Sequence, residues 1–460
     1  MMDLTVKETA EAVKGRIKGE ETLSKRICGV STDSREDSSG KLFIAIKGPR
    51  FDAHDYIEDA LSRGAVAAIS ERAEEPGGAS GAIIYVESTM KALADLAEHC
   101  RGLFRGRVAA ITGSAGKTTT KDLTASVLSQ RYRTLKSEGN LNNEIGLPKM
   151  AFKLDKSHEA AVFEMGMNHA GEIGRLSKIA RPDICVITNV GTAHIENFGS
   201  QQGILAAKAE IFDFMSPGGV AVLNGDDPYL ASLRGDPRLE GGKTIFYGLN
   251  SGELRAENVE DLGIEGMLCD ITGQGMSFKA RIPLPGMHMV YNALAAAAVG
   301  LEMGLGAQEI QNGIESFAPS KNRMEISRAK FGTIINDSYN ANPASMEAAL
   351  EVLANSKEGR KIAVLGGMFE LGVHAKELHE RVGRKAAQVG VDILICVGEL
   401  AQHIRSAYEK ETLHGKALSF ETNQECLERI EGILETGDVI LVKASRAVGL
   451  ESVAEKLKSL

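Results

Sequence analysis

The chain has 460 residues, enough for two or three domains that each bury their own core, and we expect three. Hydrophobic residues make up 43% and charged residues 25%, which excludes a largely disordered chain. The formal net charge of -9 argues against a nucleic-acid partner, because phosphate neutralisation by Lys and Arg supplies most of the affinity of a general nucleic-acid binder.

The N-terminus and the apolar pattern predict a cytoplasmic protein without a membrane span. Residues 1–8 contain no apolar signal core, and no run of about 18 apolar residues occurs anywhere in the chain. No CxxC or CxxH spacing indicates a zinc site or a disulfide framework, so we expect most cysteines to be packed thiols. The six are Cys28, Cys100, Cys185, Cys269, Cys396 and Cys426.

Residues 1–103 predict a small α/β domain. Apolar runs at 42–46, 65–69 and 82–86 have the length of strands and alternate with helical patterns such as 56–61. The segment 91–103 predicts a helix that leads into the next strand, so we place the first boundary after residue 103.

Residues 104–316 predict a central domain with a doubly wound, mostly parallel sheet. Strands at 107–112, 160–164, 184–189 and 219–223 alternate with helices, which favours parallel pairing with right-handed crossovers. Residues 254–283 lose the helical period and predict a small antiparallel addition. The alanines at 295–298 lie in a predicted helix, 288–301, and favour close packing against a neighbouring helix.

Residues 317–460 predict a third, Rossmann-like α/β domain. Its strands are expected near 332–336, 361–365, 392–397 and 438–442. It has no phosphate-binding loop of its own, and such a domain can supply residues to a site in its neighbour. The predicted fold is therefore α/β with three domains around a central sheet of the P-loop ATPase kind.

A phosphate-binding loop is predicted directly after the apolar run 107–111. A glycine-rich turn between a buried strand and a helix presents backbone N–H groups to an anion. Lys117 is expected to reach the β/γ-phosphates of a nucleotide and the Thr118 hydroxyl to bind its magnesium ion. The loop is a shortened one, because Ile111 stands where the full pattern has glycine. It consists of Gly113, Ser114, Ala115, Gly116, Lys117, Thr118 and Thr119.

Three further residues are candidates for a metal site. Glu164 and His194 each follow a predicted strand, at the carboxyl edge where ligands bind in open parallel sheets. The alternatives are a solvated strand-end glutamate and a histidine that only forms hydrogen bonds. Lys208 lies in a largely apolar helix, either as a lysine that extends its amine to solvent or as a neutral amine that becomes a carbamate and an oxygen ligand for a second magnesium.

Two polar clusters complete the candidate site. Three carboxamides within four residues, at 140–143, are either a decorated turn or the lining of a polar ligand. In the third domain, Arg323, Asp337 and Tyr339 combine a charge, an acceptor and a ring, which could hold a phosphate, a ribose and a base.

These motifs resemble the Mur ligase family, ATP-dependent amide-bond formers of peptidoglycan synthesis, over nearly the whole chain. Within the family, the pattern is most similar to the members that join D-alanyl-D-alanine to UDP-N-acetylmuramoyl-tripeptide. The matching segments are 31–35, 43–48, 112–119, 139–143, 164–167, 189–194, 208–210, 285–294, 322–325, 337–343 and 443–446.

The resemblance implies that the reaction uses ATP and two Mg²⁺ ions and passes through an acyl-phosphate intermediate, with site residues in all three domains. Lys117 and Thr118 would bind ATP-magnesium, Glu164 and His194 would serve the metal sites, and Lys208 would be carbamylated. The nucleotide would be held by Asn292, Arg323 and Asp337, the UDP group by Ser31, Asp33 and Arg35, and the sugar-peptide by Asn140, Asn142 and Asn143. A monomer is expected.

Other readings stay open. Another Mur-type amino-acid ligase or a folylpolyglutamate synthetase-like enzyme would share the loop, although the diamino-acid-adding members would be expected to carry Asp-Asn-Pro-Arg where this chain has 339–343. A non-catalytic nucleotide switch would need a specificity element such as Asn-Lys-x-Asp, which the sequence lacks. Departures from the family pattern at Ala53, Gly367 and Ala444 touch neither the phosphate nor the metal set.

Overall fold

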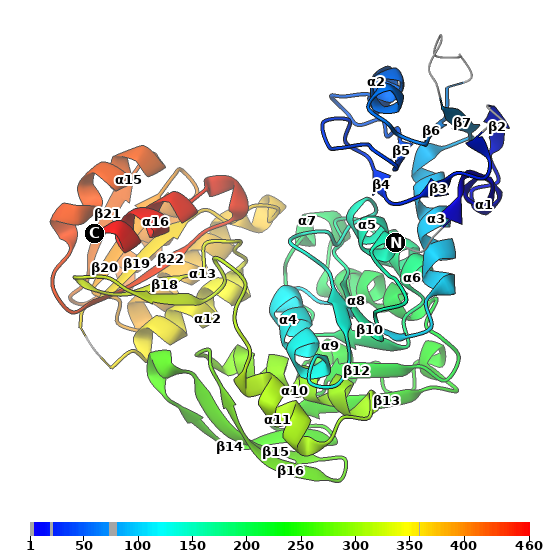
Figure 1. Ribbon diagram of the computed structural model, residues 1–460. Coiled ribbons are helices and arrows are strands. Elements are labelled where there is room, and N and C mark those ends of the chain that lie inside the picture. The colour runs from blue at the N-terminus through cyan, green and yellow to red at the C-terminus, as the bar shows by residue number, and fades with distance from the viewer. Residues whose placement is uncertain (1–3, 19–21, 73–80, 358) are drawn as a thin grey trace.

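The computed structural model describes residues 4–18, 22–72, 81–357 and 359–460, and in these ranges the helices pack on three main sheets (Figure 1). The first sheet is small and mixed, with β2 antiparallel to β7 and the other neighbours parallel. Its order is β2 (Arg16–Lys18), β7 (Ala82–Tyr85), β6 (Ala67–Ser70), β5 (Leu42–Ile44), β4 (Val30–Ser31). The predicted strands are confirmed, each shorter than its apolar run or shifted by one or two residues.

A short ribbon and three helices complete this first part of the chain. The ribbon pairs β1 (Leu4–Thr5) with β3 (Arg26–Ile27), and the helices are α1 (Val6–Ala12), α2 (Ile57–Ser62) and α3 (Thr89–Leu103). The helix predicted over 91–103 is α3; it begins two residues earlier because the Ser88 side chain accepts a hydrogen bond from the Lys91 N–H and caps it.

The second sheet has nine strands and confirms the central doubly wound prediction. It is parallel from β9 to β14 and antiparallel over its last three strands, the addition predicted for 254–283. The order is β16 (Met276–Ile282), β15 (Met267–Gly273), β14 (Leu254–Asp261), β13 (Lys243–Gly248), β12 (Val220–Asn224), β11 (Ile184–Ile187), β8 (Arg107–Thr112), β10 (Ala160–Glu164), β9 (Thr134–Lys136).

The order of these strands places β8 at a switch point. After β8 the chain adds β9 and β10 on one side, and then continues with β11 and β12 on the other side. In open α/β sheets, ligands bind outside the carboxyl end of the strand at which the winding changes direction. The carboxyl end of β8, where the glycine-rich loop begins, is such a position.

Helices cover the central sheet, and α10 packs against α4. The alanines 295–298 of α10 are fully buried, and a Cβ added at Gly300 would lie 2.7 Å from Val127 Cγ1 of α4, so the predicted close packing is confirmed. The helices are α4 (Lys117–Leu128), α5 (Gly146–Phe152), α6 (Glu172–Ala180), α7 (Ile195–Phe198), α8 (Gln201–Ala209), α9 (Pro228–Ala231), α10 (Met287–Glu302) and α11 (Ala307–Glu315).

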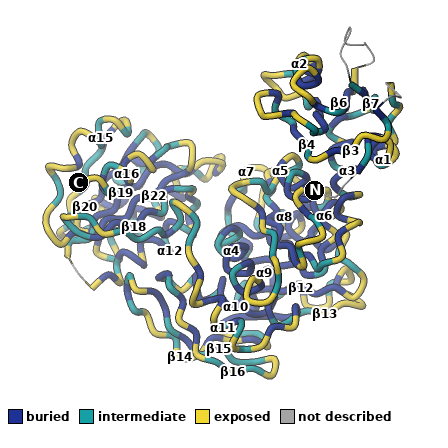
Figure 2. The backbone as a smooth tube through the Cα atoms, viewed as in Figure 1, coloured by how far each residue is buried: buried dark blue, intermediate teal, exposed yellow. Residues whose placement is uncertain are grey.

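The third sheet has six strands, and all but the edge strand β17 run parallel. Its order is β17 (Glu325–Arg328), β18 (Gly332–Asn336), β22 (Asp438–Lys443), β19 (Lys361–Gly366), β20 (Ile393–Val397), β21 (Lys416–Phe420). The helices are α12 (Pro343–Ala354), α13 (Ala375–Gln388), α14 (Ala401–Glu411), α15 (Asn423–Arg429) and α16 (Glu451–Ser459). Figure 2 shows the inner strands of the sheets as buried, as expected for parallel sheets covered on both faces.

The cysteines and the apolar helices agree with the composition. All six cysteines are free; five are buried and Cys28 is exposed. Burial raises the pKa of Cys100, Cys269, Cys396 and Cys426 to about 12, so these thiols stay protonated. In the described ranges, no helix is long and apolar enough to cross a membrane. Residues 1–3 of the N-terminal segment that lacks a signal core lie outside those ranges.

Candidate functional site

The glycine-rich loop connects β8 to the N-terminus of α4. Gly116 caps the helix in the left-handed region, at φ 81°, which a residue with a side chain rarely adopts. A Cβ added at Gly113 would lie 1.8 Å from Thr188 Oγ1, so this position has no room for a side chain. Lys117 Nζ donates to the Gly113 carbonyl at 2.7 Å. The loop therefore folds back on the Lys117 side chain, and the first N–H groups of α4 point into the space in front of the helix N-terminus.

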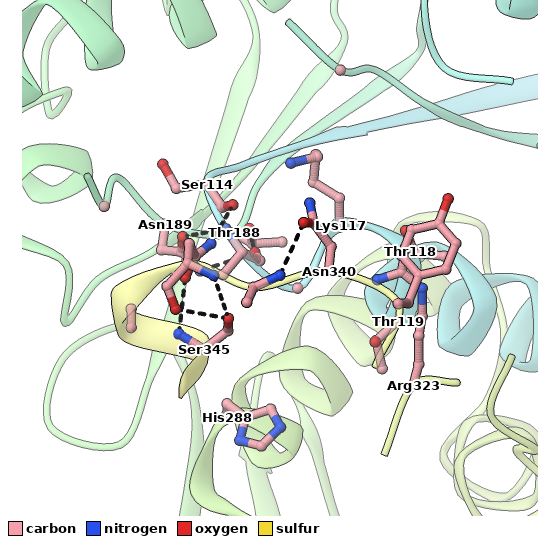
Figure 3. A pocket seen from close by; sticks show the side chains of 18 of the residues that line it. Ser114, Lys117, Thr118, Thr119, Thr188, Asn189, His288, Arg323, Asn340 and Ser345 are labelled. Atoms are coloured by element: carbon pink, nitrogen blue, oxygen red, sulfur yellow. Dashed lines mark hydrogen bonds between the residues drawn. The ribbon is translucent and has the colours of Figure 1, made fainter. Parts of the chain in front are cut away.

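The residues after β11 hold this loop in place. Thr188 Oγ1 donates to the Ala115 carbonyl at 2.6 Å, and Asn189 Nδ2 donates to the same oxygen at 3.1 Å. Asn189 Oδ1 accepts from the Ala115 N–H at 2.9 Å. We predicted a strand over 184–189, but β11 ends at Ile187, and the next two residues brace the loop (Figure 3).

A cavity of about 640 Å³ lies between this loop and the third sheet. Its wall combines the loop, the carboxyl ends of β10 and β11, and the segments that follow β18 and β22 (Figure 3). Fourteen of the predicted site residues lie in the wall: Ser114, Ala115, Gly116, Lys117, Thr118, Thr119, Asn140, Asn142, Asn143, Glu164, His194, Asn292, Arg323 and Asp337.

Glu164 ends β10 and is only 2% exposed. Its Oε1 accepts from Asn142 Nδ2 at 2.8 Å, whereas its Oε2 is buried and has no hydrogen-bond partner among the described residues. The Ser114 hydroxyl, in the same cavity wall, is likewise buried and without a described partner. Buried polar atoms normally find partners. Unsatisfied oxygens beside a phosphate loop fit a hard cation and a phosphate group.

His194 reaches the cavity from the loop before α7. Its Nδ1 lies 2.5 Å from Glu370 Oε2, an ion-pair distance without the geometry of a hydrogen bond. Burial, followed by the charges of Lys117 and Lys208, lowers the pKa of His194 to about 4. The lowered pKa favours the neutral imidazole, which is the form that can serve as a metal ligand.

Lys208 lies near the end of α8 and is 2% exposed. Burial, together with the charge of Lys117, lowers its pKa well below the usual lysine value. In the described part of the chain, no carboxylate pairs with it and no group accepts a hydrogen bond from it, and it does not line the cavity. Burial of this kind disfavours the charged form of the amine, and the side chain does not extend into solvent.

The third sheet contributes a cluster at the ends of β18 and β22. Lys443 Nζ pairs with the Asp337 carboxylate and donates to the Asn340 carbonyl at 3.0 Å. The Arg323 guanidinium carbon lies 3.9 Å from the centre of the Tyr339 ring. A flat cation on an aromatic face, next to a carboxylate, offers surfaces for a base and a ribose.

Asn292 and the carboxamides near β9 have mixed roles. Asn292 Oδ1 accepts from Thr120 Oγ1 at 3.1 Å, so it fastens α10 to the helix that follows the loop. Asn143 Oδ1 accepts hydrogen bonds from the N–H groups of Ile145 and Gly146 and so stabilises the turn. Asn143 also lines the cavity.

The predicted UDP residues lie together at the end of β4 and in the segment that follows it, outside the cavity. Ser31 Oγ donates to the Asp33 carbonyl at 2.9 Å, and the Arg35 guanidinium lies 2.6 Å from the Asp33 carboxylate. Hydrogen bonds from Arg35 lower the pKa of Asp33 well below its usual value. These three residues form a local cluster whose binding role stays a prediction.

Sequence reasoning missed several residues that support the site. Asp122, 3% exposed on α4, pairs with Lys136 at 2.7 Å and accepts from Ser320 Oγ at 2.5 Å. Ser320 begins the segment that leads to Arg323, so α4 is tied to that segment. Asn342 Nδ2 donates to the Ser114 carbonyl at 3.4 Å, and this contact joins the third sheet to the loop. Among the residues that support the site, only Thr188 and Asn189 could have been found from the sequence, because they lie at the end of a predicted strand.

Comparisons with known proteins agree with this geometry. Three family models match the chain: the Mur ligase family catalytic domain at residues 26–101, the Mur ligase middle domain at 111–300 and the Mur ligase glutamate ligase domain at 322–446. The chain is 35% identical to the UDP-N-acetylmuramoyl-tripeptide--D-alanyl-D-alanine ligase of Bacillus subtilis (strain 168) over 99% of both chains.

Solved structures have the same fold along their whole length. A crystal structure of MurF from Acinetobacter baumannii is 33% identical, with a TM-score of 0.92 and 100% of both chains covered. MurF ligase from Thermotoga maritima in complex with ADP is 31% identical, with a TM-score of 0.83 over 94% of this chain and 97% of that one. With the braced phosphate loop, the two-sided cavity and these full-length matches together, the chain belongs to the Mur ligase family.

Proposed function

We propose that this chain is an ATP-dependent ligase that joins D-alanyl-D-alanine to UDP-N-acetylmuramoyl-tripeptide in peptidoglycan synthesis. One observation carries the proposal: the phosphate loop opens into a cavity between two sheets, and the wall of this cavity contains buried oxygens that have no hydrogen-bond partner in the described part of the chain. The relatives with that printed name, which match over the full length, support the choice of substrates. The alternative Mur-type and folylpolyglutamate synthetase-like activities share the loop and are separated by the acceptor test below.

The three parts of the chain would divide the work. We assign residues 1–103 to the UDP end of the substrate, through the cluster around Asp33, and residues 104–316 to ATP. Residues 317–460 would close over the ATP site. Asn140, Asn142 and Asn143, which lie in the cavity wall beside Glu164, are assigned to the sugar-peptide.

The first step is attack of the tripeptide carboxylate on the γ-phosphorus of ATP. A bond forms between a carboxylate oxygen and the γ-phosphorus, and the bond from that phosphorus to the oxygen that bridges it to the β-phosphate breaks. The products are an acyl phosphate and ADP. Both reactants are anions, so repulsion opposes their approach. Lys117 and the N–H groups of the loop would offset that repulsion in the low-dielectric cavity.

The second step is attack of the D-alanyl-D-alanine amine on the activated carbonyl. A tetrahedral intermediate loses inorganic phosphate, and the amine proton leaves to give a neutral amide. Water would hydrolyse the acyl phosphate, so it has to be excluded while the acceptor binds. Movement of the third sheet toward the loop would provide this exclusion.

A divalent cation fits the residues around the loop. Thr118, Glu164 and His194 offer a hydroxyl, a carboxylate with a free oxygen and a neutral imidazole. Mg²⁺ held there would supply positive charge to the phosphate oxygens. We further propose that Lys208, a buried amine whose pKa is lowered, reacts in its neutral form with carbon dioxide, loses a proton and becomes an anionic carbamate that could offer oxygen ligands to a second cation.

The cavity is complete within one chain, so we propose a monomer that acts in the cytoplasm, where ATP is supplied. The test is mass analysis after incubation with ATP, Mg²⁺, D-alanyl-D-alanine and UDP-tripeptides that end in lysine or in diaminopimelate. The expected product is the UDP-pentapeptide, with one phosphate released per amide. Phosphate release with lysine or glutamate but not the dipeptide would overturn the substrate, and full-rate hydrolysis without any acceptor would indicate a nucleotide switch.

A further inference from the structure

The cationic groups of the cavity differ in whether they already have an acidic partner. Among the described residues, Lys443 pairs with Asp337, whereas no carboxylate lies within ion-pair distance of Lys117, Arg323 or Arg446. Unneutralised cations in a cavity await anionic groups of a ligand. The four cations in the wall are Lys117, Arg323, Lys443 and Arg446.

Two of the three free cations have positions that suit ATP. Lys117 lies on the phosphate loop itself, and Arg323 stacks on the Tyr339 ring at 3.9 Å. Arg446 lies on a different segment, directly after β22, and it is exposed to the cavity rather than buried. Arg446 is therefore a second cation beside Tyr339 that has no acidic partner among the described residues and can receive an anionic group of a ligand.

The Arg446 guanidinium is oriented by Tyr339, the residue on which Arg323 also stacks, and its central carbon lies 5.0 Å from the centre of that ring. Its Nη1 donates to the Tyr339 hydroxyl at 2.7 Å. Its Nε and Nη2 groups make no hydrogen bond with any described residue. These two N–H groups lie on one edge of the guanidinium plane, and their spacing matches the two oxygens of a carboxylate.

The segment that carries Arg446 is held on both sides. The backbone N–H of Ser445 donates to the Gly367 carbonyl at 3.1 Å after β19, and its hydroxyl donates to the Ala341 carbonyl at 3.3 Å after β18. The backbone N–H of Arg446 points at Asn340 Oδ1 at 3.4 Å. Three neighbouring strand ends therefore fix the position of this arginine at the carboxyl edge, where open sheets bind their ligands.

We propose that Arg446 binds the C-terminal carboxylate of the D-alanyl-D-alanine acceptor and sets the preference for an acceptor with a free carboxylate. The inference rests on the proposed function, because it takes the dipeptide as the second substrate. The carboxylate held at Arg446 orients the dipeptide so that its amine, at the other end, faces the acyl phosphate on the loop.

The test compares Arg446→Ala and Arg446→Lys with the unaltered protein, using two acceptors. D-alanyl-D-alanine is the first, and D-alanyl-D-alaninamide, which keeps the amine and lacks the carboxylate, is the second. Arg328→Ala is the control, because Arg328 is an exposed arginine on β17 that does not line the cavity. Initial rates of phosphate release and product mass give KM for each substrate.

We expect Arg446→Ala to raise KM for the dipeptide about 30-fold or more, as for loss of a charged hydrogen-bonded contact. In Arg446→Ala, KM for D-alanyl-D-alaninamide, for ATP and for the UDP-tripeptide stays within twofold of the value in the unaltered protein. Arg446→Lys recovers part of the loss, because lysine keeps the charge but not the two parallel N–H donors of the guanidinium. Equal KM values for the dipeptide in Arg446→Ala and the unaltered protein, or a rise in KM for ATP instead, would overturn the inference. Absence of dipeptide turnover in the unaltered protein would overturn the proposed function itself.

Discussion

Asn189→Ala tests whether the phosphate loop owes its shape to the end of β11. The substitution removes two hydrogen bonds: the Ala115 N–H donates to Asn189 Oδ1 at 2.9 Å, and Asn189 Nδ2 donates to the Ala115 carbonyl at 3.1 Å. The carbonyl keeps Thr188 Oγ1 at 2.6 Å, but the N–H loses its partner. An unpaired part-buried donor costs about 1–3 kcal/mol. We take about 2 kcal/mol, which corresponds to about a 30-fold loss of loop conformations that bind ATP.

The assay is KM for ATP, measured by phosphate release at saturating UDP-tripeptide and dipeptide. KM for ATP is expected to rise about 30-fold while kcat changes less, since bound phosphates restore the loop. Asn250→Ala, an exposed asparagine whose side chain makes no hydrogen bond with the described residues, is the control. A KM for ATP within twofold of the unaltered value, together with a lowered melting temperature, would refute the reasoning, because the brace would then stabilise the fold alone.

Three further predictions follow from the same region and from the third sheet. Gly113→Ala is expected to abolish ATP binding by calorimetry while the chain stays folded by circular dichroism, because the new Cβ would lie 1.8 Å from Thr188 Oγ1. Lys208→Ala is expected to abolish turnover, and short carboxylates added to the assay should recover part of it; unchanged activity would leave Lys208 without a role. His379 Nε2 accepts from the Met368 N–H at 2.8 Å, and burial lowers the pKa of this histidine. Near and below the ordinary histidine pKa of about 6.5, His379 therefore binds a proton more readily in the unfolded chain than in the folded one. The free energy of unfolding should fall as the pH is lowered from about 7.5 to about 5.5. The fall in melting temperature should be smaller in His379→Gln, and an equal fall would assign it to other groups.

Most of the fold could be predicted from local patterns in the sequence. Buried parallel strands are short continuous apolar runs, so 107–112, 332–336 and 438–442 could be placed from sequence to within a residue. The loop was found for a similar reason, because its seven residues are contiguous and each has a local conformational or chemical requirement.

Contacts between distant residues could not be predicted in this way. Asp122 and Ser320 are 198 positions apart, and the pairing depends on where α4 and the connecting segment meet in space. The same holds for His194 and Glu370, whose approach joins the second and third sheets. Lys121 and Asp122 look like exposed helix charges in sequence, yet both are nearly fully buried, at 2% and 3% exposure.

The distribution of the thiols makes this enzyme convenient for spectroscopy. Because five of the six sulfur atoms are buried and Cys28 alone is exposed, a maleimide fluorophore would attach at one position without prior mutagenesis. Cys28 lies between β3 and β4, three residues before Ser31. On the proposed assignment of residues 1–103 to the UDP end of the substrate, a dye at that position would report binding of that end by a change in its emission.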